Sequence, residues 1–375
     1  MLMHAINKYN RIPSFFNLLW MLLILGGLVP EIALAQNINN PNKKGPLGLQ
    51  VNTMTGNLFV PRTDISVPGR MFGFNASFYY NSFLFQEELG YGKGWSFEYN
   101  IKYKRDTIPG SKLIFWGDGR EDRYDSLAGG KYKSPIGFFD SLTEYQPHKY
   151  RLAYPNGVKY YFDDPTHKHI TRVEEPNGNF LQFTYTDSLL QHITNNAGQT
   201  MRFTYNNLGR LATLVDEIAT PAVTYSYVYD VSGNLIEARD PLNGRNRYTY
   251  LVNGPMKTLA DKNNNTVDII YFPDLRIREV VGCNKRMSFS YDTSSKSTVV
   301  TDHLDNGNQV SKYTYAKINE FYWVSTVSAN CCGYNLRFEY DEYGNAIKET
   351  DANGKVYTYT FDSLGNVLTA TNPAG

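Results

Sequence analysis

"TYSYVYDVSGNLIEARDPLNGRNRYTY" (residues 224–250) is the stretch of sequence that decides the fold. Aromatic residues alternate with polar ones in it, as at Tyr225, Tyr227 and Tyr229. This period of two is typical of β-strands with one buried face. Each aromatic run is followed by a turn in which Asp or Asn precedes Gly, the residue that adopts positive φ most readily. The stretch therefore predicts a β-hairpin joined to the next hairpin by a second turn.

The same phrase recurs along most of the chain. Its aromatic anchors are Tyr185, Tyr205, Tyr229, Tyr250, Tyr271, Tyr291, Tyr315, Tyr340 and Phe361. Subtracting their numbers gives spacings of 20 to 25 residues, which indicates that one structural unit is copied along the chain. An isolated hairpin is only marginally stable, so the copies are expected to pair side by side in one long sheet.

The turns after the anchors carry the other predicted repeat positions. Glycines expected to turn the chain are Gly209, Gly233, Gly344 and Gly365, and aspartates expected to cap the turns are Asp230, Asp341 and Asp362. The predicted fold class is all-β: an array of hairpin repeats that forms a long curled sheet.

Composition agrees with a β-rich chain and narrows the function classes. The 375 residues include 30 Tyr and 21 Phe, residues that suit a pleated, half-buried surface. Without Lys8, Arg11 and Glu31 of the leader, 35 basic and 35 acidic residues remain. A neutral chain with no basic run is a poor candidate for binding nucleic acid through its phosphates.

The first 35 residues have the pattern of an export signal. Lys8 and Arg11 precede the apolar stretch of residues 15–29, and Ala33-Leu34-Ala35 offers small residues for cleavage. An uncleaved anchor is the alternative, but the apolar stretch is shorter than the roughly 20 residues that span a bilayer. We expect an exported protein, secreted or held at the cell surface or in the periplasm, with no membrane span after cleavage.

Two signatures in order resemble a known family. The repeat Tyr-Asp-x-x-Gly-Asn/Arg is similar to the YD repeat of the rearrangement-hotspot (Rhs) family, shared with toxin-complex C subunits and teneurins. Upstream, "VNTMTGNLFVPRTDISVPGR" (51–70), "FYYNS" (78–82) and "GYGKGWSF" (90–97) resemble the β-rich module that precedes such repeats. The resemblance covers residues 46–375. Together with the export signal, it divides the chain into a signal peptide (1–35), an N-terminal module (36–101), a β-rich segment leading into the repeats (102–161), and the repeat array (162–375).

The resemblance implies a hollow β-shell that encloses a C-terminal toxin. This chain departs from the family pattern, because it stops at "TATNPAG" without the family's closing motif or a cargo domain. The leading hypothesis is thus a non-enzymatic exported scaffold, the opening part of a shell whose toxin cargo comes from further sequence or a neighbouring gene. An extracellular adhesion or carbohydrate-binding module is the rival, and a glycan-active enzyme comes third.

Catalytic and metal sites receive little support from the sequence. His167 and His169 could share a strand face as a metal pair, but no further ligand pattern accompanies them. Asp261 begins like a calcium loop, yet Thr266 stands where the turn glycine belongs. Asp64, Asp118 and the turn aspartates could pair for glycoside hydrolysis, although their recurrence favours turn capping. No cofactor motif is present.

Aromatic and sulfur side chains leave further alternatives open. Trp95, Trp116 and Trp323 lie outside the anchor register and could stack on sugars of a cell-surface glycan. The favoured interpretation of the tyrosine anchors is inward packing, with hydroxyls paired across neighbouring repeats. Cys283 could pair with Cys331 or Cys332, or all three thiols could be free.

Overall fold

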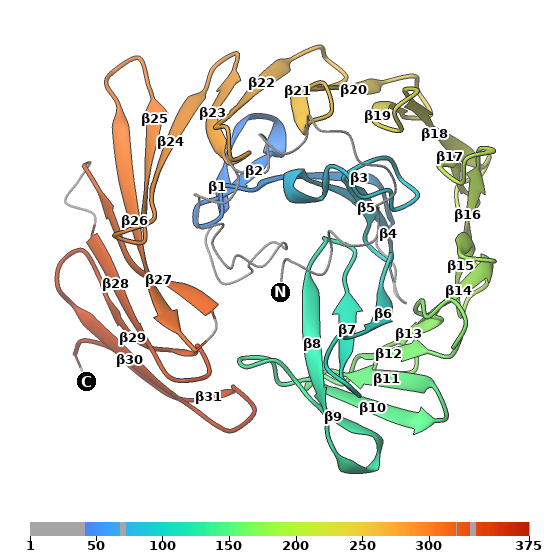
Figure 1. Cartoon of the computed structure of the whole chain (residues 1–375), viewed down its shortest axis with the longest axis horizontal. Helices are drawn as coiled ribbons and strands as arrows, with labels where there is room; N and C mark the ends of the chain where they lie inside the picture. Colours follow the sequence, from blue (N-terminus) through green and yellow to red (C-terminus); the bar gives the residue numbers. More distant parts are fainter. Residues whose placement is uncertain (1–41, 68–72, 320, 331–334, 375) are drawn as a thin grey trace, which may run out of the picture. The chain divides into compact units, whose positions relative to one another are not determined.

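The computed structural model describes residues 42–67, 73–319, 321–330 and 335–374 (Figure 1). These residues form strands and turns, and their helical segments are three single 3-10 turns, Pro46–Gly48, Ser82–Leu84 and Ala128–Gly130. The predicted all-β class is confirmed. Within the described ranges, no helix has the length and apolar character needed to cross a membrane. The predicted signal peptide, residues 1–35, lies outside them.

The first sheet is built by the N-terminal module, and neighbouring strands pair antiparallel in chain order. Its strands are β1 (Asn42–Lys44), β2 (Gln50–Asn52), β3 (Leu58–Val67), β4 (Phe74–Asn81) and β5 (Trp95–Phe97). Residues Leu58, Phe78, Tyr80, Trp95 and Phe97 of these strands are almost completely buried. The module therefore has a closely packed core made largely of aromatic side chains.

The second sheet is one antiparallel ladder in chain order from β6 to β31, and among the described residues β31 pairs with β30 alone. Its first strands are β6 (Lys102–Arg105), β7 (Lys112–Phe115), β8 (Glu121–Ser126), β9 (Lys131–Lys133), β10 (Ser141–Gln146), β11 (Lys149–Ala153), β12 (Lys159–Phe162) and β13 (Arg172–Glu174). Tyr103 N–H donates to Lys168 O (3.0 Å), and Ile170 N–H donates to Ile101 O (3.0 Å). These bonds close the β6–β12 part of the ladder on itself.

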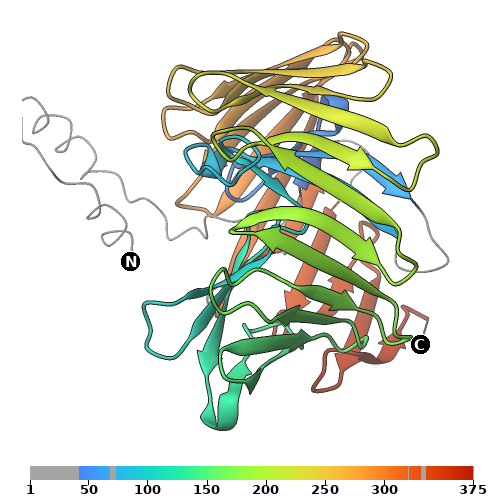
Figure 2. The ribbon, with the colours of Figure 1, turned by 90° about the vertical axis from the view of Figure 1, so that its right-hand side faces the viewer.

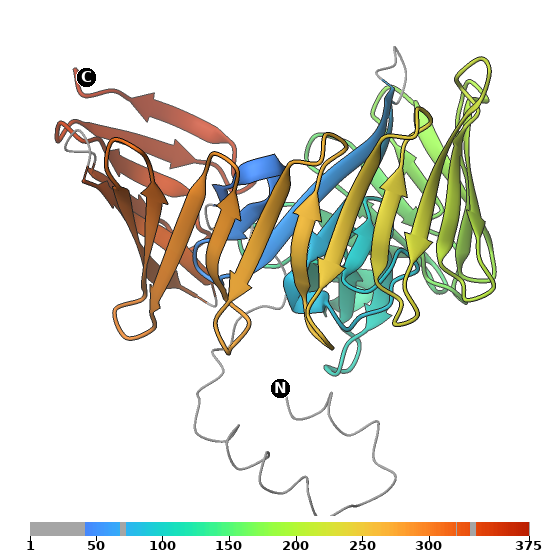
Figure 3. The same cartoon turned by 90° about the horizontal axis from the view of Figure 1, so that it is seen from above.

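The repeats contribute the remaining strands of the ladder. They are β14 (Phe180–Thr186), β15 (Leu189–Asn195), β16 (Thr200–Tyr205), β17 (Leu211–Asp216), β18 (Val223–Tyr229), β19 (Leu235–Arg239), β20 (Arg245–Tyr250), β21 (Met256–Ala260), β22 (Thr266–Tyr271), β23 (Ile277–Gly282), β24 (Arg286–Asp292), β25 (Ser297–His303), β26 (Gln309–Ile318), β27 (Phe321–Ala329), β28 (Asn335–Tyr340), β29 (Ala346–Thr350), β30 (Val356–Phe361) and β31 (Val367–Thr371). Figures 2 and 3 show these strands side by side, with their hairpin turns along two rims.

The ladder is curled, and the N-terminal module lies against its inner face (Figure 1). Rings from the two parts meet in reverse chain order. Phe97 contacts Phe203 (5.4 Å between centroids), whereas Trp95 contacts Tyr248 (5.0 Å). Earlier still in the module, Gly56 O accepts a hydrogen bond from Ile277 N–H (2.9 Å). The module and the repeats therefore share one hydrophobic core.

Candidate functional site

The anchor tyrosines join each repeat to its predecessor. Their hydroxyls donate to a backbone carbonyl of the strand that immediately precedes them in the ladder. The pairs are Tyr205 to Leu190 (2.9 Å), Tyr229 to Leu211 (2.8 Å), Tyr250 to Leu235 (2.7 Å), Tyr271 to Met256 (2.7 Å), Tyr291 to Ile277 (2.9 Å) and Tyr340 to Val324 (2.7 Å). The buried hydroxyls of Tyr185 and Tyr315 have no such carbonyl partner, and Phe361 has no hydroxyl. Each of these anchor tyrosines thus adds a side-chain hydrogen bond between its hairpin and the preceding one.

The turns after the anchors are built by the residues that the sequence singles out. Asp230 Oδ1 accepts from Asn234 N–H (2.9 Å), and Asp230 Oδ2 accepts from Asn234 Nδ2 (2.9 Å). Asp341 and Asp362 make the same pair of bonds to Asn345 and Asn366. The glycine before each Asn has positive φ, at 91°, 86° and 76° for Gly233, Gly344 and Gly365, and Gly209 has 72°. This is a type I turn closed by a left-handed glycine.

A second regularity sits at the anchors themselves. The pairing register shifts by one residue between Val228 and Tyr229, between Thr249 and Tyr250, and at most other anchors. Tyr291 is an exception, because β24 pairs with β25 without a shift. Each β-bulge increases local twist and bends the strand. The repeated bulges are therefore a source of the curl of the sheet.

An ion pair lies between the module and the repeats. Arg62 Nε and Nη2 donate to the two carboxylate oxygens of Asp64 (2.9 and 3.1 Å), and both side chains are 8% exposed. Tyr227 OH donates to Asp64 (2.7 Å), and Arg62 Nη1 donates to Tyr248 OH (3.3 Å). Burial lowers the pKa of Arg62, but Asp64, Tyr248 and Tyr227 together outweigh it, so the net pKa is raised and the side chain stays charged. Sequence reasoning missed Arg62, because the burial of this ion pair and its contact with Tyr248 depend on residues that lie far along the chain.

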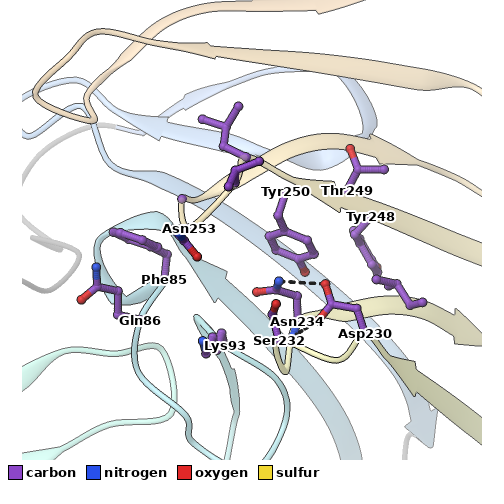
Figure 4. Close-up of a pocket in the computed structure, with 14 residues that line it drawn as sticks. Phe85, Gln86, Lys93, Asp230, Ser232, Asn234, Tyr248, Thr249, Tyr250 and Asn253 are labelled. Carbon is purple, nitrogen blue, oxygen red and sulfur yellow. Dashed lines mark hydrogen bonds between the residues drawn. The ribbon is translucent and has the colours of Figure 1, made fainter.

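A cleft of ≈ 760 Å³ opens beside this ion pair, between the module and two hairpin turns (Figure 4). We call it the module–repeat cleft. One wall is residues 85, 86 and 93 of the module, and the other is residues 230–236 and 248–254 of the repeats. Lys93 N–H donates to Gly233 O (3.0 Å), which ties the two walls together. No motif in the sequence marks this cleft, because its walls come from separate parts of the chain.

The predicted histidine pair lines a second, smaller cavity of ≈ 380 Å³. His167 Nδ1 contacts Asp164 Oδ2 (2.7 Å), whereas buried His169 stacks on Tyr185 (5.1 Å between centroids). Burial and neighbouring Lys102 lower the pKa of His169 to about 4. Among the described residues, no cluster of three or more His, Cys, Asp or Glu side chains could hold a metal ion.

The carboxylates that the sequence offered for calcium binding or glycoside hydrolysis accept hydrogen bonds from residues close to them in the chain. Asp261 caps its own turn through Asn263 N–H and Asn265 N–H (2.9 Å each), so the calcium-like stretch is a polar hairpin turn. Asp118 accepts from Arg120 N–H (3.0 Å), and Asp64 is held by Arg62. The structure brings none of these carboxylates together as a free catalytic pair within the described ranges.

The tryptophans considered for sugar stacking are buried or half-buried. Trp95 is 0% exposed and donates from Nε1 to Tyr250 OH (3.0 Å), and Trp116 is 7% exposed and donates to Asp122 (2.6 Å). Trp323 is half-buried against Tyr340. Stacking on a sugar needs an open ring face, so Trp95 and Trp116 act as packing residues here and the glycan-stacking expectation does not fit their positions.

The predicted pairing of Cys283 with Cys331 or Cys332 stays a prediction. Cys283 lies exposed in the turn between β23 and β24 as a free thiol, and its two possible partners, Cys331 and Cys332, lie outside the described residues.

Comparison with known proteins gives matches at both ends of the chain. The domain of unknown function DUF6531 matches residues 48–124, and the RHS repeat matches residues 340–375. Over 316 residues the chain is 25% identical to the tRNA nuclease WapA of Bacillus subtilis (strain 168) and to the tRNA(Glu)-specific nuclease WapA of Bacillus subtilis subsp. natto (strain BEST195). Each match covers 71% of this chain and 13% of the relative, so the chain spans a small part of the length of these relatives.

Solved structures with a similar course of the chain include TcdB2-TccC3-Cdc42, with a TM-score of 0.40 and 12% identity over 89% of this chain and 19% of that one. TcdB2-TccC3 gives a TM-score of 0.37 and 12% identity over 91% and 21%. The sequence matches agree with the tyrosine-anchored hairpins described above. Two separate parts of the chain thus match family models, and its tyrosine-anchored hairpins resemble the YD repeats of the Rhs family.

Proposed function

We propose that this chain is a non-enzymatic, exported wall segment of an Rhs-type shell that encloses or presents a toxic cargo. The observation that carries the proposal is the continuous ladder from β6 to β31, whose repeats are joined both by backbone pairing and by tyrosine hydroxyls bonded to carbonyls. Because each repeat contacts only its neighbours, further repeats can be added to such a wall without changing the structure of those already present.

Two further observations support a structural role. Both carboxylate oxygens of the turn aspartates accept hydrogen bonds within their own turns, as at Asp230. These carboxylates are therefore held in place as turn caps and are not placed to act as a catalytic acid or base. The WapA relatives are named as tRNA nucleases, and this chain matches 13% of their length. A wall that serves an activity residing elsewhere, in further sequence or in a neighbouring gene, fits both facts.

The test is protection of a cargo. Residues 36–375 are produced together with the polypeptide encoded directly downstream or in the adjacent gene, and the pair is treated with a nonspecific protease. We expect the two to purify together and the cargo to survive at least about ten times longer than it does alone, because a buried chain must open before it is cut. A cargo that neither co-purifies nor gains protection would refute the shell role.

Export is tested separately. A tagged full-length chain is followed in cytoplasmic, periplasmic, membrane and medium fractions beside a variant that lacks residues 2–35. We expect the full chain outside the cytoplasm and the shortened chain inside it. Retention of both chains in the cytoplasm would contradict the signal peptide.

A further inference from the structure

We propose that the cavity lined by the histidine pair binds a small organic acid, in which a carboxylate is carried on an aromatic ring. We call this cavity the histidine cavity. Its volume of ≈ 380 Å³ falls within the range of about 300 to 1,000 Å³ typical of ligand sites. Its walls come from the module and from the first repeats, and Leu211 N–H donates to Gly90 O (2.9 Å) between them. The proposal does not depend on the shell role.

The hydroxyl of Tyr185 in the wall of the histidine cavity is an exception among the anchors. The hydroxyls of most other anchors donate to a carbonyl of the preceding strand, as Tyr205 does to Leu190 O (2.9 Å). The buried hydroxyl of Tyr185 has no hydrogen-bond partner among the described residues. Leaving a buried donor unpaired costs free energy, so a ligand that accepts this hydrogen bond would recover that cost.

A second unpaired polar atom belongs to the neighbouring ring. His169 is 8% exposed and stacks on Tyr185 (5.1 Å between centroids), and its Nδ1 has no hydrogen-bond partner among the described residues. With its pKa lowered to about 4 by burial and Lys102, the imidazole is neutral at pH 7 and can carry its proton on Nδ1. Two stacked rings in one wall therefore each have a hydrogen bond to offer.

The charge of the ligand follows from Lys102. An isolated antiparallel bridge pairs Lys102 with His169, and both residues line the cavity. Residues directly opposite in an antiparallel pair place their side chains on the same face. Burial and neighbouring Lys104 lower the pKa of Lys102, and the acidic groups nearby do not offset them, because Glu121 forms its ion pair with Lys104. A carboxylate on the ligand would supply the missing counter-charge.

The rest of the wall indicates an apolar body for the ligand. Its apolar and aromatic lining residues include Leu89, Leu189, Leu190, Tyr99 and Tyr205. A flat ring would cover these side chains, whereas an inorganic anion would leave most of them uncovered. The one carboxylate in the wall, Glu88, accepts from Arg210 Nε (2.7 Å) and so has its own cation. A metal ion fits less well, because the described residues offer no cluster of three ligands.

The test is calorimetry of the purified chain (36–375) at pH 7 with three probes: phenylacetate, its neutral amide phenylacetamide, and inorganic phosphate. We expect phenylacetate to bind at least about tenfold more tightly than either of the others, because it alone combines the charge with the ring. Lys102→Met should weaken phenylacetate binding by at least about tenfold, and Tyr185→Phe should weaken it by about fivefold.

Tyr185→Phe also separates ligand binding from a structural role. It removes a hydroxyl that has no partner among the described residues, so the ligand-free variant should unfold at or above the wild-type temperature. Tyr205→Phe, which loses the bond to Leu190 O, should unfold at a lower temperature.

Lys159→Met is the matched control for the loss of charge. Lys159 is paired with Glu174 (3.9 Å) and does not line the cavity, so its variant should keep the affinity for phenylacetate within about twofold. If Lys102→Met does not fold, Tyr185→Phe carries the test. The proposal is overturned if phenylacetate does not bind, if phenylacetamide or phosphate binds as tightly, or if the folded cavity variants keep the wild-type affinity.

Discussion

At the scale of single residues, one tyrosine hydroxyl serves two parts of the protein. Tyr250 OH donates to Leu235 O (2.7 Å) and accepts from Trp95 Nε1 (3.0 Å). Tyr250→Phe leaves both partners unsatisfied in the core, and we expect it to lower the free energy of unfolding by about 2 to 3 kcal/mol in urea denaturation. Tyr271→Phe, which removes a single bond to Met256 O, should cost about 1 kcal/mol.

The exposed side chain of Tyr343 provides the control for these two variants. Tyr343→Phe should change stability by less than about 0.5 kcal/mol. Equal losses for Tyr250→Phe and Tyr271→Phe would show that the hydroxyl of Tyr250 does not join the module to the repeats.

A second residue-scale effect depends on pH. Burial raises the pKa of Asp122 to about 6, although Arg120 (3.2 Å) and the Trp116 indole (2.6 Å) favour its charged form. Between the unfolded value near 3.9 and about 6, the folded protein binds more protons, so this group makes the protein less stable as pH rises. His169, whose pKa is lowered to about 4, acts in the opposite direction over the same range.

The Asp122 effect is isolated by comparing Asp122→Asn with the wild type at each pH. We expect the wild type to lose stability relative to the variant by on the order of 2 kcal/mol between pH 4 and pH 7. The measurement is urea denaturation at half-unit steps of pH. A stability difference between wild type and variant that stays constant across the pH range would contradict a raised pKa of Asp122 in the folded protein.

At the scale of the hairpin, the turn glycines differ in what surrounds them. Gly344 (φ 86°) lies against the Trp323 indole, which an added Cβ would overlap, whereas Gly354 (φ 77°) has open space around its missing Cβ. Gly354→Ala should cost about 1 to 2 kcal/mol from the left-handed backbone alone. Gly344→Ala should cost about 1 to 3 kcal/mol more, because the indole must move.

Thermal unfolding of the two glycine variants measures this difference. Both glycines end a turn that an aspartate caps, Asp341 and Asp351, so the backbone contribution is matched. Equal destabilisation would mean that the Trp323 indole shifts at no cost and that the turn geometry alone requires glycine.

At the scale of the whole molecule, the buried ion pair couples the module to the repeats. Arg62→Met leaves the Asp64 carboxylate buried without its cation, and such losses cost about 3 to 5 kcal/mol. Hydrogen exchange should then speed up together in the module and in the strands that carry Tyr227 and Tyr248, because one core serves both.

Arg202→Met is the control for this variant. Its partner Glu217 and Arg202 itself are both well exposed, with 38% and 42% of their side chains accessible, so the loss should stay below about 1 kcal/mol. Faster exchange confined to the module after Arg62→Met would show that the module and repeats open independently.

The sequence by itself determined the strands, the turns and the repeated unit. Alternating side chains, the Asp-x-x-Gly-Asn turn and the spacing of anchors are local properties, since they depend on the backbone conformation of a few neighbouring residues. The all-β class and the Rhs resemblance followed from them and are confirmed.

Tertiary structure alone decided which residues meet. Arg62 and Tyr248 are 186 positions apart, and Trp95 and Tyr250 are 155 apart. Their contacts depend on the curl of the sheet, which accumulates from the twist and bulges of many strands and is not encoded in any one repeat. For the same reason, the burial of Trp95 and Trp116 and the walls of the module–repeat cleft emerge only when the module rests against the repeats.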